Sequence, residues 1–314
     1  MKKKFPLIYA GITISLMIVL GILYYSSARA SSEQANIMPL EYQQDKPQPL
    51  TVDVLLPEEI SFAGEKVPLH RLDVQEALRK ELIVNTYLHS HTIQVLRNAP
   101  RIFARIEPIL KAQGIPEDFK YLAVIESNLN PLAVSPAGAA GIWQFMPGTA
   151  REAGLEVNYE IDERYNLEKS TLAAAAYIQK AYDNFGTWTL AAASYNAGPN
   201  MIRKQIGIQK ENNYYDLLLG EETERYVFRI LALKQILNNP LLYNFDIQSA
   251  NPVEKTKKVK VKGTVESWAD FAHKHKISYK TLKRFNPWLR KSGLKNHEHK
   301  AYEILIPVNP ENYR

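Results

Sequence analysis

The spacing of apolar residues between Leu72 and Leu242 constrains the fold more than any other feature of the sequence. Over this stretch they recur with the 3.6-residue period of an α-helix, first around Leu78 and again around Ile106. Glycines and prolines interrupt the pattern where helices would stop. We therefore expect an all-α body, with helices starting at Pro116 and covering about Ser170–Phe185, Thr187–Asn196 and Glu222–Asn238.

The pattern changes after residue 256. Lys258–Lys262 and Tyr302–Ile306 alternate apolar and other residues with the period of a strand, whereas Ser267–His275 and Ser278–Phe285 keep helical spacing. This order predicts a small β-α-α-β domain behind the helical body. The expected fold class is therefore mainly α, with a short β-containing module at the C-terminus.

The N-terminus indicates export. Lys2–Lys4 precede an apolar run from Phe5 to about Tyr25, and Ala28-Arg29-Ala30 is typical of a cleavage site. The run is also long enough for a helix to cross a bilayer of about 30 Å. A cleaved signal peptide and a retained inner-membrane anchor both stay open, and either one sends the remaining chain to the periplasm or cell envelope.

Five prolines among residues 31–70 predict a linker between this segment and the body, with Val52–Leu56 able to dock on the body. The predicted division of the chain is signal or anchor over 1–30, linker over 31–70, helical domain over 71–245, connector over 246–256 and module over 257–308.

Charge and cysteine content narrow the choice of partners. The sequence has no cysteine, which excludes disulfides and a cysteine nucleophile. Residues 255–300 hold 14 Lys or Arg against 3 Asp or Glu. Such a basic module predicts an anionic partner. Outside the cytoplasm this partner is wall polymer or a membrane surface rather than nucleic acid, and the oligomeric state is left open.

Glu126 is the main candidate for chemistry. It follows the apolar segment Tyr121–Ile125, and a carboxyl group in apolar surroundings has a raised pKa that lets it act as an acid near neutral pH. A glutamate at a helix end is more often solvated, so the residue alone does not decide. The loop from Ser135 to Ala150 is rich in Gly and Ala, which lets backbone approach a ligand closely. Within it, the apolar side chains flanking Gln144 either line a sugar cleft or fill the core.

Four ordered motifs strengthen the case: Glu126-Ser127, Gly141-Ile142-Trp143-Gln144, Ser194-Tyr195-Asn196-Ala197-Gly198, and Tyr226 beside Glu222-Thr223. Over about residues 95–245 they resemble the catalytic domain of the soluble lytic transglycosylase family, which has a goose-lysozyme-like α fold. The tail resembles a lysin motif (LysM), a binder of N-acetylglucosamine polymers, although Gly263-Thr264-Val265 replaces that family's Gly-Asp-Thr turn.

The resemblance implies a peptidoglycan lytic transglycosylase. Such an enzyme cleaves the β-1,4 bond between N-acetylmuramic acid and N-acetylglucosamine without water, and leaves 1,6-anhydromuramoyl ends. Glu126 would be the catalytic acid and then the base, and no cofactor or metal would be needed. The implied substrate contacts are Ser127, Ser135, Gln144, Met146, Tyr195, Asn196 and Tyr226. Ile142 and Trp143 depart from the family's Leu-Met, and we expect this to alter how a sugar packs.

Two other functions stay open on the sequence alone. A lysozyme of the same fold would hydrolyse the bond, using Glu152, Glu156 or Asp162 to position water. A non-catalytic wall-binding protein would not need Glu126. Metal binding at the three His-x-His pairs, such as His89 and His91, is not expected, because positions i and i+2 of a helix do not face each other.

Overall fold

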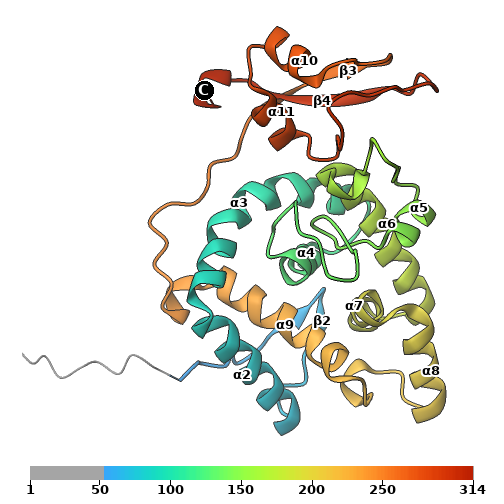
Figure 1. Ribbon diagram of the computed structural model, residues 1–314. Helices are drawn as coiled ribbons and strands as arrows, with labels where there is room; N and C mark the ends of the chain where they lie inside the picture. The colour runs from blue at the N-terminus through green and yellow to red at the C-terminus, as the bar shows by residue number, and fades with distance from the viewer. Residues whose placement is uncertain (1–52, 314) are drawn as a thin grey trace, which may run out of the picture. The chain divides into compact units, whose positions relative to one another are not determined.

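A computed structural model describes residues 53–313 (Figure 1). The predicted export segment 1–30 and the first part of the predicted linker lie outside these residues. None of the described helices is both long and apolar enough to cross a membrane. The helices of the body are α2 Leu72–Tyr87, α3 His89–Ala112, α4 Lys120–Ser127, α5 Pro147–Glu152, α6 Leu167–Phe185, α7 Trp188–Ala197, α8 Pro199–Gln209 and α9 Glu221–Asn238.

The short helix α4 occupies the middle of the body, with α3, α6, α7 and α9 around it (Figure 1). Every side chain from Tyr121 to Ile125 is buried. Burial on all sides gives α4 a fixed position, because moving it would expose apolar area worth about 25 cal/mol per Å². The helix ends where Asn128 takes a left-handed conformation with φ 55°. Glu126, near its end, is therefore placed by a helix that is packed on all sides.

Local signals in the sequence explain the helix boundaries. The side chain of Asn166 accepts a hydrogen bond from the Lys169 N–H at the start of α6, and Thr187 caps α7 in the same way. Gly186 ends α6 in the left-handed conformation that glycine adopts at low cost. The predicted all-α body is confirmed. The expectation is incomplete for α5 and α8: each has proline as its first residue, where proline starts a helix instead of breaking one.

Residues 53–70 pack on the body, so this half of the predicted linker does not stand apart from it. Strands β1 (Ser61–Phe62) and β2 (Glu65–Lys66) form a small antiparallel hairpin. Val54, Phe62 and Val67 are buried in the core of the body. The carboxylate of Glu65 accepts hydrogen bonds from the backbone N–H groups of Trp188 and Thr189, at 2.5 and 3.0 Å, and so caps α7.

The C-terminal unit has the predicted β-α-α-β order, which confirms the expectation for this part of the fold. Its elements are β3 Thr256–Val261, α10 Trp268–Lys274, α11 Tyr279–Phe285 and β4 Tyr302–Pro307. The two strands pair antiparallel, with Val259 opposite Ile304. Trp268, Leu282 and Ile304 are fully buried between the ribbon and the two helices. We call residues 256–307 the LysM-like module.

Candidate active site

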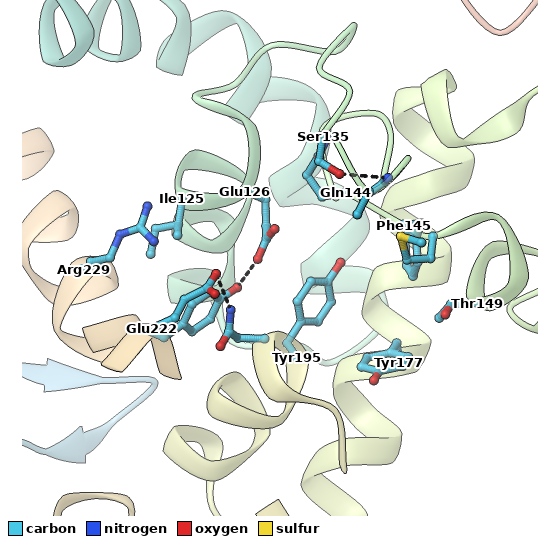
Figure 2. A pocket seen from close by; sticks show the side chains of 15 residues that line it. Ile125, Glu126, Ser135, Gln144, Phe145, Thr149, Tyr177, Tyr195, Glu222 and Arg229 are labelled. Carbon is cyan, nitrogen blue, oxygen red and sulfur yellow. Dashed lines mark hydrogen bonds between the residues drawn. The ribbon is translucent and has the colours of Figure 1, made fainter. Parts of the chain in front are cut away.

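A cavity of about 590 Å³ opens beside the C-terminal end of α4 (Figure 2). It is shaped by α4, α6, α7, α9 and the loop before α5. Carboxyl, phenol, amide and guanidinium groups reach it from segments far apart in the sequence. Its lining residues are Ile125, Glu126, Ser135, Ala137, Ala139, Gln144, Phe145, Met146, Thr149, Tyr177, Tyr195, Asn196, Glu222, Tyr226 and Arg229.

Glu126 lies on the wall of this cavity, with its carboxyl group held by Tyr226. The Tyr226 hydroxyl donates a hydrogen bond of 2.6 Å to Glu126 Oε1 (Figure 2). Burial raises the pKa of the Glu126 carboxyl above its usual range, while the Tyr226 hydrogen bond and the positive charge of Arg229 oppose that rise. The net effect favours the protonated acid, with one carboxyl oxygen fixed by the phenol.

Two tyrosines enclose the acid. Burial raises the pKa of both Tyr195 and Tyr226 well above the ordinary value, and the nearby Glu126 adds to it, so both phenols stay neutral. The Tyr195 hydroxyl donates to the backbone oxygen of Trp143 at 2.8 Å. Its ring meets that of Tyr177 edge to face, with centroids 5.4 Å apart. The tyrosines are therefore rigid parts of the wall rather than groups that titrate.

The Gly- and Ala-rich loop after α4 forms another wall. Gln144 has a left-handed backbone with φ 49°, and its side-chain Nε2 donates to the backbone oxygens of Gly141 at 2.7 Å and Ala133 at 3.2 Å. Gln144 Oε1 accepts no hydrogen bond from any described residue, so it is available to a ligand. Ser135 Oγ accepts from the Ala139 N–H at 3.0 Å and so holds the turn closed.

Asn196 links α7 to α9 at the rim. Its amide donates to Glu222 at 3.2 Å and accepts from the Thr223 hydroxyl at 2.8 Å. Glu222 is exposed and lines the cavity. Its negative charge adds to the rise in the Glu126 pKa, as the last of four causes. The Glu-Thr pair therefore orients the Asn196 amide and supplies a second carboxylate at the site.

The structure brings most of the predicted site residues together. Seven of them line the cavity: Glu126, Ser135, Gln144, Met146, Tyr195, Asn196 and Tyr226. Ser127 does not line it, because its hydroxyl is buried and donates back to the Ala123 oxygen at 2.9 Å.

The expectation that Ile142 and Trp143 alter sugar packing is wrong. Both are buried, at 1% and 0% exposure, and the Trp143 indole N–H donates to the Thr171 hydroxyl at 2.9 Å. These two side chains fill the core under the loop. Met146, at 42% exposure, is instead open to a ligand.

Sequence reasoning missed Thr149, Tyr177 and Arg229 as lining residues. Arg229 follows Tyr226 by three positions on α9, so helical spacing alone places both on one face. Tyr177 directly follows the run Ala173–Ala176 on α6, and no motif in the sequence singles it out. The carboxylates suggested for a hydrolase, Glu152, Glu156 and Asp162, do not line this cavity. Among residues 53–313, no three His, Cys, Asp or Glu side chains lie close enough to hold a metal ion.

Fold and site define a helical protein that presents a partly buried carboxylic acid, Glu126, to a polar cleft. Residues 106–218 match the transglycosylase SLT domain, and residues 257–310 match the soluble lytic transglycosylase C-terminal LysM-like domain. The chain therefore contains a transglycosylase SLT domain over the first of these ranges and a LysM-like domain over the second. Tyr226 lies beyond the first match, although it bonds Glu126.

Relatives of known name agree with this assignment. The chain is 33% identical over 226 residues to membrane-bound lytic murein transglycosylase D of Escherichia coli K12. The aligned region covers 70% of this chain and 49% of that protein. It is 30% identical over 132 residues to the soluble lytic murein transglycosylase of the same strain, covering 38% and 20%. The chain thus spans about half the length, or less, of these curated relatives. The crystal structure of the 70 kDa soluble lytic transglycosylase of E. coli matches with 26% identity over 43% of this chain and 24% of that chain, at a TM-score of 0.37.

Proposed function

We propose that this protein is a peptidoglycan lytic transglycosylase that cleaves the β-1,4 bond between N-acetylmuramic acid and N-acetylglucosamine and leaves 1,6-anhydromuramoyl ends. The observation that carries the proposal is the partly buried carboxylic acid Glu126 at the wall of a polar cleft, with a pKa raised by burial and a 2.6 Å hydrogen bond from Tyr226. The names of the relatives support the substrate class.

The chemistry needs one group that gives a proton and then takes one. Protonated Glu126 gives its proton to the glycosidic oxygen, and the bond from that oxygen to the anomeric carbon of the muramoyl residue breaks. The Glu126 carboxylate then takes the proton of the muramoyl 6-hydroxyl, whose oxygen bonds to the anomeric carbon. Glu126 ends protonated as it began, so no water is consumed.

The surrounding groups fit this cycle. Because Tyr226 holds Oε1, the other carboxyl oxygen is left to face the substrate. The same hydrogen bond stabilises the carboxylate that exists between the two proton transfers. Gln144 Oε1 accepts from a sugar hydroxyl or acetamido N–H, and Asn196, Ser135 and Met146 contact the strand. Tyr195 shapes the wall beside Glu126, and Ser127 supports α4.

Hydrolysis is the second candidate function, and one observation favours it. Glu222 gives the cavity a second carboxylate, and a hydrolase uses such a carboxylate as the general base that activates water. Mass spectrometry of the products from purified sacculi separates the two. Anhydro ends support the transglycosylase, whereas reducing ends support a lysozyme.

The test compares the native chain with Glu126→Gln and Glu222→Gln. On the transglycosylase proposal, Glu126→Gln lowers the release of anhydro ends by at least about 10²-fold, the usual contribution of a general acid. Glu222→Gln keeps the anhydro product. Release of anhydro ends at the normal rate by Glu126→Gln would refute the assignment, and a protein that only binds the wall would give no product in any variant.

We further propose that residues 71–245 act as the catalytic domain and residues 257–308 as the wall-binding domain, in the periplasm or cell envelope. The excess of Lys and Arg in the module supports binding to an anionic wall polymer. A β-lactamase fused to the C-terminus tests export, because it protects cells only when it is translocated. Sedimentation with purified sacculi at low and high salt tests the electrostatic binding.

A further inference from the structure

The LysM-like module and the loop between α5 and α6 form a short antiparallel pairing. The Asp162 N–H donates to the Trp288 oxygen at 2.9 Å, and the Arg290 N–H donates to the Glu160 oxygen at 2.8 Å, so that Ile161 lies opposite Leu289. These two backbone hydrogen bonds fix the register between the loop and the module. Backbone groups, in addition to side chains, therefore hold the loop against the module.

Apolar side chains of the body complete the module's core. Ile161, Tyr165 and Ala140 are buried at 1%, 7% and 1% exposure, in one cluster with the module's own core residues. The Arg290 guanidinium lies 4.3 Å from the centre of the Tyr165 ring. Ala140 directly follows Ala139, which lines the cleft, so this cluster reaches from the module to the loop that forms the cleft wall.

Polar groups at the edge of the contact are also paired. The Tyr302 hydroxyl donates to Glu156 at 3.0 Å, and the Lys295 N–H reaches the Glu160 carboxylate at 3.3 Å. The bond from Tyr302 explains why the Glu156 carboxylate faces the module instead of the cleft.

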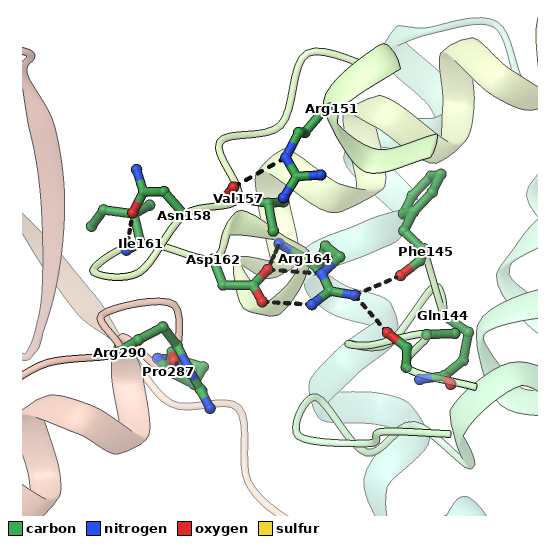
Figure 3. Close-up of polar contacts among 12 residues, drawn as sticks. Gln144, Phe145, Arg151, Val157, Asn158, Ile161, Asp162, Arg164, Pro287 and Arg290 are labelled. Carbon is green, nitrogen blue, oxygen red and sulfur yellow. Dashed lines mark hydrogen bonds and ion pairs between the residues drawn. The ribbon is translucent and has the colours of Figure 1, made fainter. Parts of the chain in front are cut away.

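Arg164 connects the pairing to the cleft. Its guanidinium binds the Asp162 carboxylate through two hydrogen bonds, at 2.9 and 2.7 Å, and both side chains are about nine-tenths buried. Its Nη1 donates to the backbone oxygens of Gly138 at 2.8 Å and Phe145 at 3.1 Å (Figure 3). These two oxygens stand at the two ends of the loop segment that carries Gln144.

The backbone of the same loop packs directly against Arg164. A Cβ added at Gly141 would lie 1.9 Å from the Arg164 backbone oxygen, and Gly141 has a φ of 79°. No side chain fits there, so the loop and residue 164 move together. A shift of Arg164 would displace Gln144 and Phe145, both of which line the cavity.

From these contacts we propose that Arg164 is a positioning residue for the Gln144 loop, and that the docked LysM-like module holds Arg164 in place through Ile161 and Asp162. The module is then a structural part of the catalytic cleft in addition to any role in binding the wall. Undocking the module loosens the loop and weakens the hold on the substrate, while the Glu126 carboxyl, carried by α4, keeps its surroundings.

Hydrogen exchange of the full-length chain tests the structural half. Ile161→Asp places a charge in the module contact, and Arg164→Lys keeps the charge but cannot reproduce the planar fork to Asp162 and both carbonyl oxygens. In both variants the amides of Ala140 and Gly141 exchange at least about tenfold faster, while those of α9 do not change. Ile161→Val and Lys258→Ala, the second of which breaks only the exposed ion pair to Glu303, are the matched controls.

Kinetics on soluble glycan fragments tests the functional half, which rests on the proposed function. Both variants raise KM by about tenfold and change kcat by less than about threefold, because they weaken substrate contacts of the Gln144 loop and leave the catalytic acid Glu126 in place. The alkaline limb of the pH profile stays where it is in the native chain.

Unchanged exchange of Ala140 and Gly141 in either variant overturns the proposal, even where the module itself has unfolded. An equal rise of KM in the matched controls also overturns it. Hydrogen exchange does not depend on catalysis. If the native chain released no anhydro ends, the proposed function would be refuted, but the hydrogen-exchange result would still test the coupling between module and loop.

Discussion

The hydrogen bond from Tyr226 to Glu126 allows the proton chemistry to be tested by removing one atom. Tyr226 is 1% exposed, and phenylalanine fills nearly the same space, so Tyr226→Phe removes the 2.6 Å bond with little change in packing. The bond lowers the Glu126 pKa because it is stronger to the carboxylate than to the neutral acid. Its removal therefore raises that pKa further.

The size of the change follows from the two hydrogen-bond strengths. A bond to a charged acceptor contributes about 1.5–3 kcal/mol and a neutral one about 0.5–1.5 kcal/mol. The difference of about 1 kcal/mol, set against about 1.4 kcal/mol per pH unit, makes Glu126 titrate roughly 0.7–1 pH unit higher in the variant. Turnover falls, because the carboxylate that must recover the sugar proton has lost its donor.

NMR titration of chain labelled with ¹³C at the glutamate carboxyl groups measures this pKa without any need for turnover. Glu126→Gln identifies the signal. Tyr195→Phe is the matched control, since that hydroxyl donates to the Trp143 oxygen and not to Glu126. A Glu126 titration that stays in place or moves to lower pH in Tyr226→Phe, or moves equally in Tyr195→Phe, would refute the reasoning.

Three further substitutions follow from the same structure. Gly141→Ala, which forces a methyl group against a backbone oxygen at a positive φ, destabilises the fold by more than about 1 kcal/mol and lowers Tm by several degrees. Gly148→Ala, in helix α5 with open space around it, does not lower Tm. Trp143→Phe loses a buried indole and its hydrogen bond at a cost of about 1–3 kcal/mol in chemical denaturation, with KM unchanged because residue 143 does not reach the cavity. Glu126→Gln is more stable than the native chain above the raised Glu126 pKa, and this advantage shrinks as pH falls below it, because the native acid is then neutral too; Tm measured from pH 4 to pH 8 gives the sign.

The sequence carried most of the information about the body and the acid. The helical period, the capping residues and the stop signals predict the positions of α6, α7 and α9, because those signals act within about one helical turn. The meeting of Glu126 with Tyr226, a hundred residues apart, depended on motif resemblance, since no periodicity states which helix faces are neighbours. Trp143 shows the limit of that resemblance: a motif position identifies a loop, but packing decides which of its side chains point inward.

The contact between module and body escaped sequence reasoning for a different reason. Its central element is a pairing of backbone groups, and backbone bonds leave no residue-type signal. Asp162 was read as a possible second acid because carboxylates suggest chemistry when their partner is unknown. With Arg164 beside it, both of its oxygens are occupied. The partner of a charge, more than the charge itself, decides its role, and partners are set by tertiary structure.

The arrangement around Glu126 also explains why opposing influences serve this chemistry better than a single strong one. Burial alone would raise the pKa until the acid held its proton too firmly to give it up, whereas full pairing with a cation would keep it ionised and unable to start. Here burial is opposed by a phenol that cannot ionise and by Arg229 at longer range. A group that must release one proton and recover another within a cycle works best when neither protonation state is favoured by much. The Tyr226 bond limits the rise in the Glu126 pKa that burial causes.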